Sequence, residues 1–304
     1  MRRTRIGAAF AGIAIAALAL TACNSGTPGA APSAGGDASE GTDEGTAWFE
    51  VAEGVTLDGS PTFEKISAAG KVTVGVKEDQ PGLGYVDVVT GERTGFDVDI
   101  ARWIAASLGI DEENIEFQRV DSSAREQSLV NGDIDYYVGT YSITDKRKEL
   151  IDFAGPYFIT GQGLLVAADS DITGEGDLDE STNVCSATGS TPIQNIRENY
   201  PSVPTTEFNS YSECVEALIN GQVAAVTTDQ AILIGYAAQN PDELKVVGEP
   251  FSEERYGVGL AKGDTVMKDH INTLFTDGGE IWQAIFDKNL GSSGITVEQP
   301  AVDQ

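Results

Sequence analysis

Hydroxyl and guanidinium side chains in one short stretch, residues 140–147, are suited to binding a small anion. Thr140, Ser142 and Thr144 place hydroxyls at alternate positions, and Arg147 follows about one helical turn later. Thr144 or the residue after it can cap a helix start. An arginine near a helix N-terminus binds a carboxylate well, because it offers a bidentate fork beside free N–H donors. A capped helix with solvent-exposed basic side chains would explain the same residues.

The elements before this stretch alternate in type. We expect strands at 71–77, 114–120 and 134–140, a further strand at 86–89, and helices at 62–69, 100–108 and 124–131. Alternating strands and helices indicate an α/β fold with a mostly parallel sheet. The ligand crevice of such a sheet lies at the carboxyl ends of its strands. Lys77 and Thr140 both fall at strand ends of this kind.

A second series of the same kind follows later in the chain. We expect strands at 164–167, from Val184, at 223–227, 243–248 and 256–261, and helices at 193–199, 212–220, 230–239, 266–275 and 279–288. The segment 152–163, with Gly155-Pro156, is expected to interrupt the pattern, and Thr191 is expected to be the N-cap before Pro192.

The second series lies inside the chain, and the last strand and helices can rejoin the first. This predicts two lobes, one of residues 48–160 plus 254–304 and one of residues 161–253, joined by two crossings. Interfaces between lobes are preferred ligand sites.

Composition excludes several classes of protein. The chain has 304 residues and a net charge of −29, which argues against nucleic-acid or anionic-lipid binding over a broad face. An anionic ligand must therefore be attracted by a few local cations. One histidine and three cysteines leave little room for a metal site or a histidine-based triad. No phosphate-binding or dinucleotide-binding glycine motif follows an expected strand, so we expect no cofactor and no metal.

The N-terminus resembles a bacterial lipoprotein signal. Three arginines within the first five residues precede an apolar run, 6–20, and small residues then lead to Cys23. We expect a signal peptide at 1–22 and a lipid on Cys23. An ordinary signal peptide with a coincidental cysteine is the alternative. Residues 23–47 are rich in Gly, Ala, Ser, Thr and Pro, which predicts a flexible tether to the outer face of the cell membrane.

Two further cysteines remain once Cys23 is assigned to the lipid. Outside the cytoplasmic membrane the surroundings are oxidising, which favours a disulfide between Cys185 and Cys214. Two buried free thiols are the alternative.

Four sequence blocks together resemble the family 3 extracellular solute-binding proteins, which serve polar amino-acid ABC importers. The blocks are GFDVDIA at 95–101, SITDKR at 142–147, FAGPY at 153–157 and GST at 189–191. The resemblance spans about residues 63–290. KEDQPG at 77–82, the cysteine pair and Thr228-Asp229 are most similar to the actinobacterial glutamate-binding lipoproteins.

The resemblance implies a type II periplasmic-binding-protein clamshell: two α/β lobes, each a mostly parallel sheet flanked by helices, with two hinge crossings. It implies a monomeric receptor, not an enzyme, that closes on L-glutamate or L-aspartate. The receptor would deliver this ligand to the permease and ATPase of an ABC importer. We expect no nucleic-acid partner.

The resemblance also implies roles for residues that grip the amino-acid backbone. Arg147 would bind the α-carboxylate, with backbone N–H groups of Ser142 and Thr191. The α-ammonium would lie among the Thr140 carbonyl, the Ser142 hydroxyl and the Asp229 carboxylate.

Lys77 and Arg125 match positions that hold a side-chain carboxylate in acidic-amino-acid binders of this family. A buried zwitterion needs each of its charges paired, because desolvation otherwise makes binding unfavourable. An amide ligand would leave Lys77 and Arg125 poorly paired. A solvated Lys77, or an Arg125 in a surface ion pair with Asp79 or Asp121, is the alternative.

Three other functions remain open at this stage. The chain could be a glutamine or asparagine receptor, a sensor acting through a separate membrane protein, or an enzyme on the same fold such as a dehydratase. Retention of both Arg147 and Asp229 argues against the enzyme. Tyr85 and Tyr141 are candidates to line the cleft.

Overall fold

A computed structural model describes residues 49–303 of the chain. The expected signal peptide, Cys23 and the expected tether lie outside the described residues. No helix within the described part is both long enough and apolar enough to cross a membrane.

The helices and strands follow the expected alternation. The helices are α1 (Pro61–Ala69), α2 (Phe96–Ser107), α3 (Arg125–Asn131), α4 (Asp145–Lys148), α5 (Thr191–Asn199), α6 (Tyr211–Ile219), α7 (Gln230–Gln239), α8 (Thr265–Asp277) and α9 (Gly279–Leu290), with short 3₁₀ turns at Glu112–Asn114 and Glu175–Asp177. The strands are β1 (Val72–Val76), β2 (Asp79–Gln80), β3 (Gly84–Val86), β4 (Arg93–Thr94), β5 (Ile115–Arg119), β6 (Tyr136–Tyr137), β7 (Asp152–Thr160), β8 (Gln162–Ala167), β9 (Val184–Ala187), β10 (Thr205–Phe208), β11 (Ala225–Asp229), β12 (Leu244–Val247) and β13 (Glu254–Leu260).

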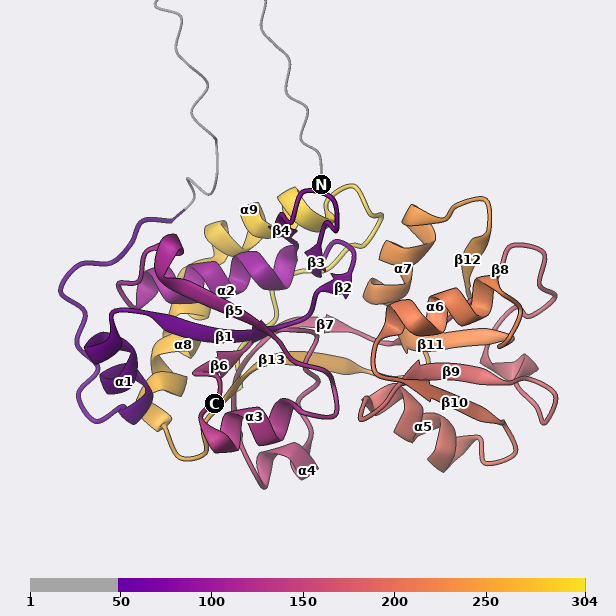
Figure 1. Cartoon of the computed structure of the whole chain (residues 1–304), viewed down its shortest axis with the longest axis horizontal. Helices are drawn as coiled ribbons and strands as arrows, with labels where there is room; N and C mark the ends of the chain where they lie inside the picture. Colours follow the sequence, from indigo (N-terminus) through magenta and orange to yellow (C-terminus); the bar gives the residue numbers. More distant parts are fainter. Residues whose placement is uncertain (1–48, 304) are drawn as a thin grey trace, which may run out of the picture. The chain divides into compact units, whose positions relative to one another are not determined.

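Two five-stranded sheets define two lobes (Figure 1). The first lobe has the strand order β5-β1-β6-β13-β7, and the second has the order β10-β9-β11-β8-β12. In each sheet one strand runs against the other four, β13 in the first and β8 in the second. A small sheet of β2, β3 and β4 belongs to the first part of the chain. This architecture agrees with the two-lobed α/β fold implied by the sequence resemblance.

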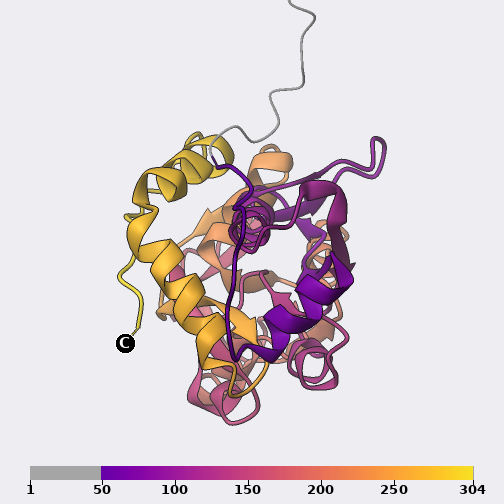
Figure 2. The same ribbon diagram turned by 90° about the vertical axis from the view of Figure 1, so that its left-hand side faces the viewer.

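Helices cover the sheets on both faces. In the second lobe, α6 and α7 lie on one face and α5 on the other (Figure 1). In the first lobe, α2 packs against α9, and α8 packs along β7. The two C-terminal helices lie together on one flank, and α1 lies on the opposite flank (Figure 2).

The core of the first lobe is aromatic. Phe96 contacts the rings of Phe158, Trp282 and Phe286 at centroid distances of 5.4–6.2 Å. Trp103 packs on Phe275 in the same core. Trp103 and Trp282 are both buried in this core. Burying rings of this size contributes much of the hydrophobic free energy of folding.

The expected interruption at 152–163 is wrong, because β7 runs unbroken through most of it. It pairs with β13, and the register shifts between Tyr256 and Val258, so that residues 155–157 lie opposite Gly257 alone. This bulge accommodates Pro156, which has no N–H to give to the ladder. The next strand, β8, belongs to the second sheet, and β13 belongs to the first again.

Other strand boundaries also differ from expectation. The strand expected at 134–140 is regular only at Tyr136–Tyr137, because Thr140 adopts a φ of 47° that ends the extended backbone. The strand expected at 86–89 ends at Val86, and Val88 and Val89 are exposed. The edge strand β10 has no equivalent among the expected elements; its four residues are only half-buried, which weakens the hydrophobic signal.

Candidate functional site

Lys77 and Arg125 meet at the carboxyl end of β1. The Lys77 ammonium donates to the Ser122 hydroxyl at 2.9 Å, and Arg125 Nε donates to the Ser122 carbonyl at 3.1 Å. Both side chains are nearly inaccessible, with 5% and 2% of their surface exposed. Burial, followed by the charge of Arg125, lowers the pKa of Lys77 to about 7. These two cations therefore form one buried basic pair.

Neither cation of this pair has an acidic partner in the described part of the chain, since no carboxylate lies within 4.0 Å of either. Asp121 instead pairs with Arg119 at 3.1 Å, and Asp79 accepts hydrogen bonds from the second lobe. The alternatives of a solvated Lys77 and of an Arg125 in a surface ion pair are therefore wrong.

The ring of Tyr141 contacts the two guanidinium groups of the site. Arg125 lies 4.3 Å and Arg147 4.9 Å from the centre of its ring. Such cation–π contacts attract each cation to the negative face of the ring. Arg125 also reaches the Thr140 carbonyl at 3.5 Å and the Gly189 carbonyl at 3.5 Å. Tyr141 is fully buried and acts as a platform beneath the cations.

Arg147 belongs to the short helix α4, and hydrogen bonds fix both its backbone and its guanidinium group. As expected, Thr144 caps this helix, with its hydroxyl accepting from the backbone N–H of Arg147. The guanidinium donates to the Ser142 carbonyl at 2.6 Å and to the Gly189 carbonyl of the second lobe at 3.2 Å. Its Nε also donates to Glu126 at 3.1 Å. Sequence reasoning missed Glu126, and its position directly after Arg125 was the one available signal.

Thr140 is fixed by a buried carboxylate. Its backbone N–H donates to Asp97 at 2.8 Å, and the Tyr157 hydroxyl donates to the other oxygen of Asp97 at 2.8 Å. The Thr140 hydroxyl donates to Gln80 at 3.1 Å. Burial raises the pKa of Asp97 to about 6, against the opposing effect of these hydrogen bonds. Asp97 thereby holds the turn that presents the Thr140 carbonyl.

Thr191 connects the second lobe to the first lobe and to the hinge. Its hydroxyl lies 3.3 Å from that of Ser142 and donates to Glu254, at the start of β13, at 3.0 Å. The expectation that Thr191 is the helix N-cap is wrong: Ser190 caps α5, and its hydroxyl accepts from the N–H of Ile193. The serine one position earlier already has the extended backbone of a cap, which leaves the Thr191 hydroxyl available to the cleft.

Asp229 is the buried acid of the second lobe. It ends β11, and one carboxylate oxygen accepts from the Tyr256 hydroxyl at 2.6 Å. The other oxygen has no hydrogen-bond partner among the described residues, and the side chain is 3% exposed. Burial, followed by the charge of Glu254, raises the pKa of Asp229 to about 8. An added cation would satisfy this oxygen and favour the ionised form.

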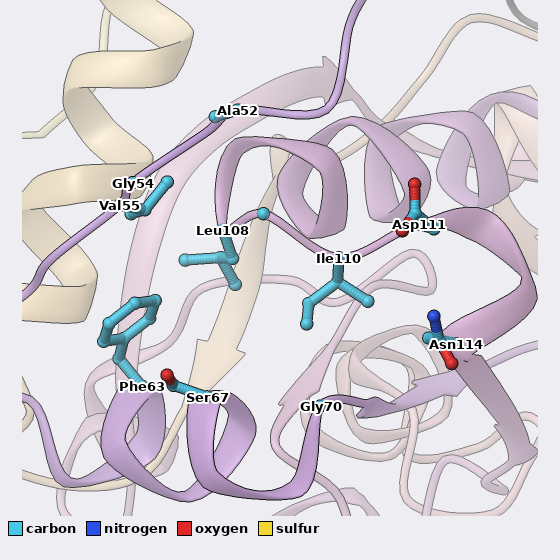
Figure 3. Close-up of a pocket in the computed structure, with 11 residues that line it drawn as sticks. Ala52, Gly54, Val55, Phe63, Ser67, Gly70, Leu108, Ile110, Asp111 and Asn114 are labelled. Carbon is cyan, nitrogen blue, oxygen red and sulfur yellow. The ribbon is translucent and has the colours of Figure 1, made fainter.

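Two hollows in the described part of the chain differ in character. One, of about 490 Å³, is lined by Arg147 and Glu126 from the first lobe and by Gly189 and Thr191 from the second, whereas Lys77, Arg125 and Asp229 do not line it. The other, of about 310 Å³, lies between α1 and the end of α2 (Figure 3). Apart from Asp111, its lining is uncharged, and it contains none of the expected site residues.

The predicted disulfide is confirmed: Cys185 of β9 is bonded to Cys214 of α6. The free-thiol alternative is therefore wrong. The bond joins a strand and a helix of the second lobe.

Comparisons with known proteins agree with this geometry. The bacterial extracellular solute-binding proteins, family 3, match residues 72–291. The glutamate-binding protein GluB of Corynebacterium efficiens is 41% identical over 76% of this chain and 82% of its own. The glutamine-binding protein of Geobacillus stearothermophilus is 45% identical over 68% and 79%. The structure of an ancestral arginine-binding protein bound to arginine has a TM-score of 0.66 and 33% identity, and covers 73% of this chain and 99% of that one.

The fold and the site thus define a two-lobed receptor for amino acids. The chain belongs to the bacterial extracellular solute-binding proteins, family 3. This membership indicates an extracytoplasmic protein of amino-acid transport.

Proposed function

We propose that the protein captures an acidic amino acid, L-glutamate or L-aspartate, between its lobes. The observation that carries this proposal is the buried pair Lys77 and Arg125, which has no carboxylate partner among the described residues. Two buried cations side by side repel each other, and a ligand carboxylate between them would remove this repulsion. The Ser122 hydroxyl would complete the pocket for that carboxylate.

The remaining charges of the ligand have partners of their own. Arg147, with the backbone N–H groups of Ser142 and Thr191, would bind the α-carboxylate. The α-ammonium would bind the unpartnered oxygen of Asp229 and the Thr140 carbonyl. Each charge of glutamate is then paired, which is what burial of a zwitterion between lobes demands.

Ligand binding would also drive closure. The proposed contacts come from the first lobe, through Arg147 and Lys77, and from the second lobe, through Thr191 and Asp229. A ligand that touches both lobes binds the closed state more tightly than the open state and shifts the population toward it. We propose that the chain crosses between the two moving lobes at 160/161 and at 253/254.

A second candidate is a glutamine receptor. A relative of this chain is named a glutamine-binding protein. The lowered pKa of Lys77, about 7, leaves much of this amine neutral at neutral pH. A neutral amine can accept a hydrogen bond from a side-chain amide, whereas an ammonium cannot. Buried Arg125 nonetheless keeps its charge, and a neutral amide leaves that charge without a counter-ion. The acidic ligand is therefore the first candidate.

We further propose that the captured amino acid is handed to the permease and ATPase of an ABC importer, and that a lipid on Cys23 anchors the monomeric protein to the outer face of the membrane. The family's role in transport supports the first part. The lipoprotein-like sequence before Cys23 supports the second.

Uptake by a strain lacking the gene tests delivery. Radiolabelled glutamate and glutamine would be offered to the deletion strain, complemented with the wild type or with Arg147→Ala. We expect glutamate uptake to be lost on deletion, restored by the wild type and not by the variant. Unchanged uptake of both amino acids in the deletion strain would favour a sensor acting through another membrane protein.

A further inference from the structure

A short projection of the first lobe reaches into the second lobe beside the site. It consists of residues 79–81, here called the β2 tongue, and it contacts α6 and α7 of the second lobe. Figure 1 shows β2 pointing toward these two helices. The tongue follows Lys77 by two residues, and its Gln80 accepts from the Thr140 hydroxyl at 3.1 Å. The same segment therefore contacts both the opposite lobe and the proposed ligand site.

Asp79 completes the N-terminus of α6. Within α6 the Ser210 hydroxyl accepts from the N–H of Glu213, and the Glu213 carboxylate accepts from the N–H of Ser210. The first two N–H groups of the helix, those of Tyr211 and Ser212, donate instead to Asp79 Oδ2 at 3.0 and 3.2 Å. A carboxylate at this position also interacts favourably with the positive end of the helix dipole.

The helix α7 contacts the other parts of the tongue. The Tyr236 hydroxyl donates to the Asp79 carbonyl and lies 3.3 Å from the Asp79 carboxylate. Beside it, a Cβ added to Gly235 would lie 2.3 Å from the carbonyl oxygen of Pro81. Gly235 has a helical backbone open to any residue, so the glycine is explained by this close approach of the tongue.

We propose that the β2 tongue is a closure latch. Asp79 caps α6 only while the lobes are closed, so the latch stabilises the closed state without touching the ligand. This inference rests on the proposed capture of an amino acid between the lobes. Affinity falls when less of the protein occupies the binding-competent closed state, so a broken latch weakens binding through the conformational equilibrium.

The disulfide supports the latch from the second lobe. Cys214 lies in the first turns of α6, and its bond to Cys185 of β9 holds the helix end that receives Asp79. Asp79 is thus a positioning residue: its carboxylate meets a helix end that is itself fixed to the sheet.

The test uses two variants that break the latch from opposite sides. Asp79→Ala removes the carboxylate from the first lobe, and Gly235→Ala places a methyl group against the tongue from the second. Asp58→Ala, which removes an exposed acid of the first lobe, is the control. Affinity and dissociation rate would be measured with L-glutamate and L-glutamine, and the ligand-free radius of gyration by small-angle X-ray scattering.

We expect both latch variants to bind the preferred amino acid on the order of tenfold more weakly, chiefly through faster dissociation, and to have a larger ligand-free radius of gyration. The control should match the wild type. Wild-type dissociation rate and radius of gyration in both variants would overturn the latch and leave the proposed function intact. If the wild type binds neither amino acid, the proposed function fails, and the latch is then overturned by a wild-type radius of gyration in both variants.

Discussion

The side chain of Lys77 is unusual because the folded protein holds an ammonium group in a dry position beside another cation. Its burial and the charge of Arg125 bring its pKa to about 7. Asp229 is the corresponding buried acid: its pKa is raised to about 8, and one of its oxygens lacks a partner in the described structure. The charged form of each group is less stable without a ligand partner than with one. The two buried charges therefore lower the stability of the ligand-free protein, compared with uncharged side chains at the same positions.

Replacing Lys77 by methionine tests whether this lysine favours ligand binding and lowers the stability of the ligand-free protein. We expect Lys77→Met to weaken glutamate binding by tens- to thousands-fold, because a buried charge loses its partner. Glutamine binding should change much less. The folded pKa of Lys77 is below its unfolded value, so the lysine destabilises the ligand-free protein at neutral pH and below. The variant should accordingly raise the free energy of unfolding by on the order of 1 kcal/mol.

Calorimetry and thermal unfolding of the ligand-free variant measure both effects. Lys71→Met, which changes an exposed lysine of the same lobe, is the matched control. Equal losses of glutamate and glutamine affinity would contradict the assignment of Lys77 to the side-chain carboxylate.

The pH dependence of glutamate binding should be bell-shaped. A bound carboxylate raises the pKa of Lys77, so affinity falls as the pH rises above about 7. A bound ammonium lowers the pKa of Asp229, so affinity also falls as the pH drops below about 8. The optimum therefore lies between these values. Lys77→Met should flatten the alkaline side and Asp229→Asn the acidic side in titrations across this range. An affinity independent of pH in the wild type would contradict both assignments.

At the residue scale, sequence reasoning identified the charged groups but not what surrounds them. The stretch around Arg147 was suggested by its residue types, and Lys77 was placed at a strand end by the alternation of elements. The roles proposed for Lys77 and Asp229 came from the resemblance to the family 3 solute-binding proteins. The contacts of Glu126 with Arg147 and of Glu254 with Thr191 could not be predicted from the sequence. Both acids come from elements distant in sequence from their partners, and only the fold brings them together.

Among the elements, the turn after β6 is fixed by contacts with a helix distant in the sequence. Thr140 has a positive φ, and its N–H and the Tyr157 hydroxyl both donate to Asp97 at the start of α2. The helix start and the turn are therefore one unit, although 43 positions separate their residues.

Removing the Asp97 carboxylate should loosen this unit. We expect Asp97→Ala to lower the free energy of unfolding by about 1–3 kcal/mol, because it leaves two buried donors without an acceptor. Glutamate binding should weaken as well, since the Thr140 carbonyl loses its fixed direction. Chemical denaturation and calorimetry measure the two effects, with Asp99→Ala, in the same helix turn, as the comparison. Wild-type stability and affinity in Asp97→Ala would contradict this account of the turn.

The elements that sequence patterns predicted well are those with local signals. The helix α7 begins and ends where expected, and α1 ends at Ala69 as expected, before Gly70, whose φ of 63° suits a glycine. The strand β7 was missed because Gly155-Pro156 indicates a break locally. Its continuity depends on pairing with β13, a hundred residues further along the chain, because the extra residues of β7 bulge opposite Gly257.

For the whole molecule, the disulfide stabilises the lobe that carries Asp229 and Thr191. Replacing both Cys185 and Cys214 by alanine should lower the free energy of unfolding by about 2–4 kcal/mol. The closed latch should also weaken, because α6 loses its link to β9. Thermal unfolding of the double variant, compared with the wild type under reducing and oxidising conditions, measures the first effect. Equal stability of the reduced and oxidised wild type would contradict it.

The two-lobed arrangement itself was predictable, since a first series of strands and helices interrupted by a second leaves few other topologies. The contacts between the lobes were not predictable, because they depend on the β2 tongue, on Thr191 and on carbonyl groups such as that of Gly189. No pattern in the sequence marks such backbone contacts.

The most direct test of the account is a calorimetric titration of the purified protein with glutamate, aspartate, glutamine, asparagine and arginine at a pH between the two site pKa values. The account predicts tight one-to-one binding of glutamate or aspartate, with the corresponding amide weaker by at least about tenfold. Tight binding of glutamine or arginine, with glutamate no better, would contradict the role of Lys77 and Arg125 while leaving the two-lobed receptor in place.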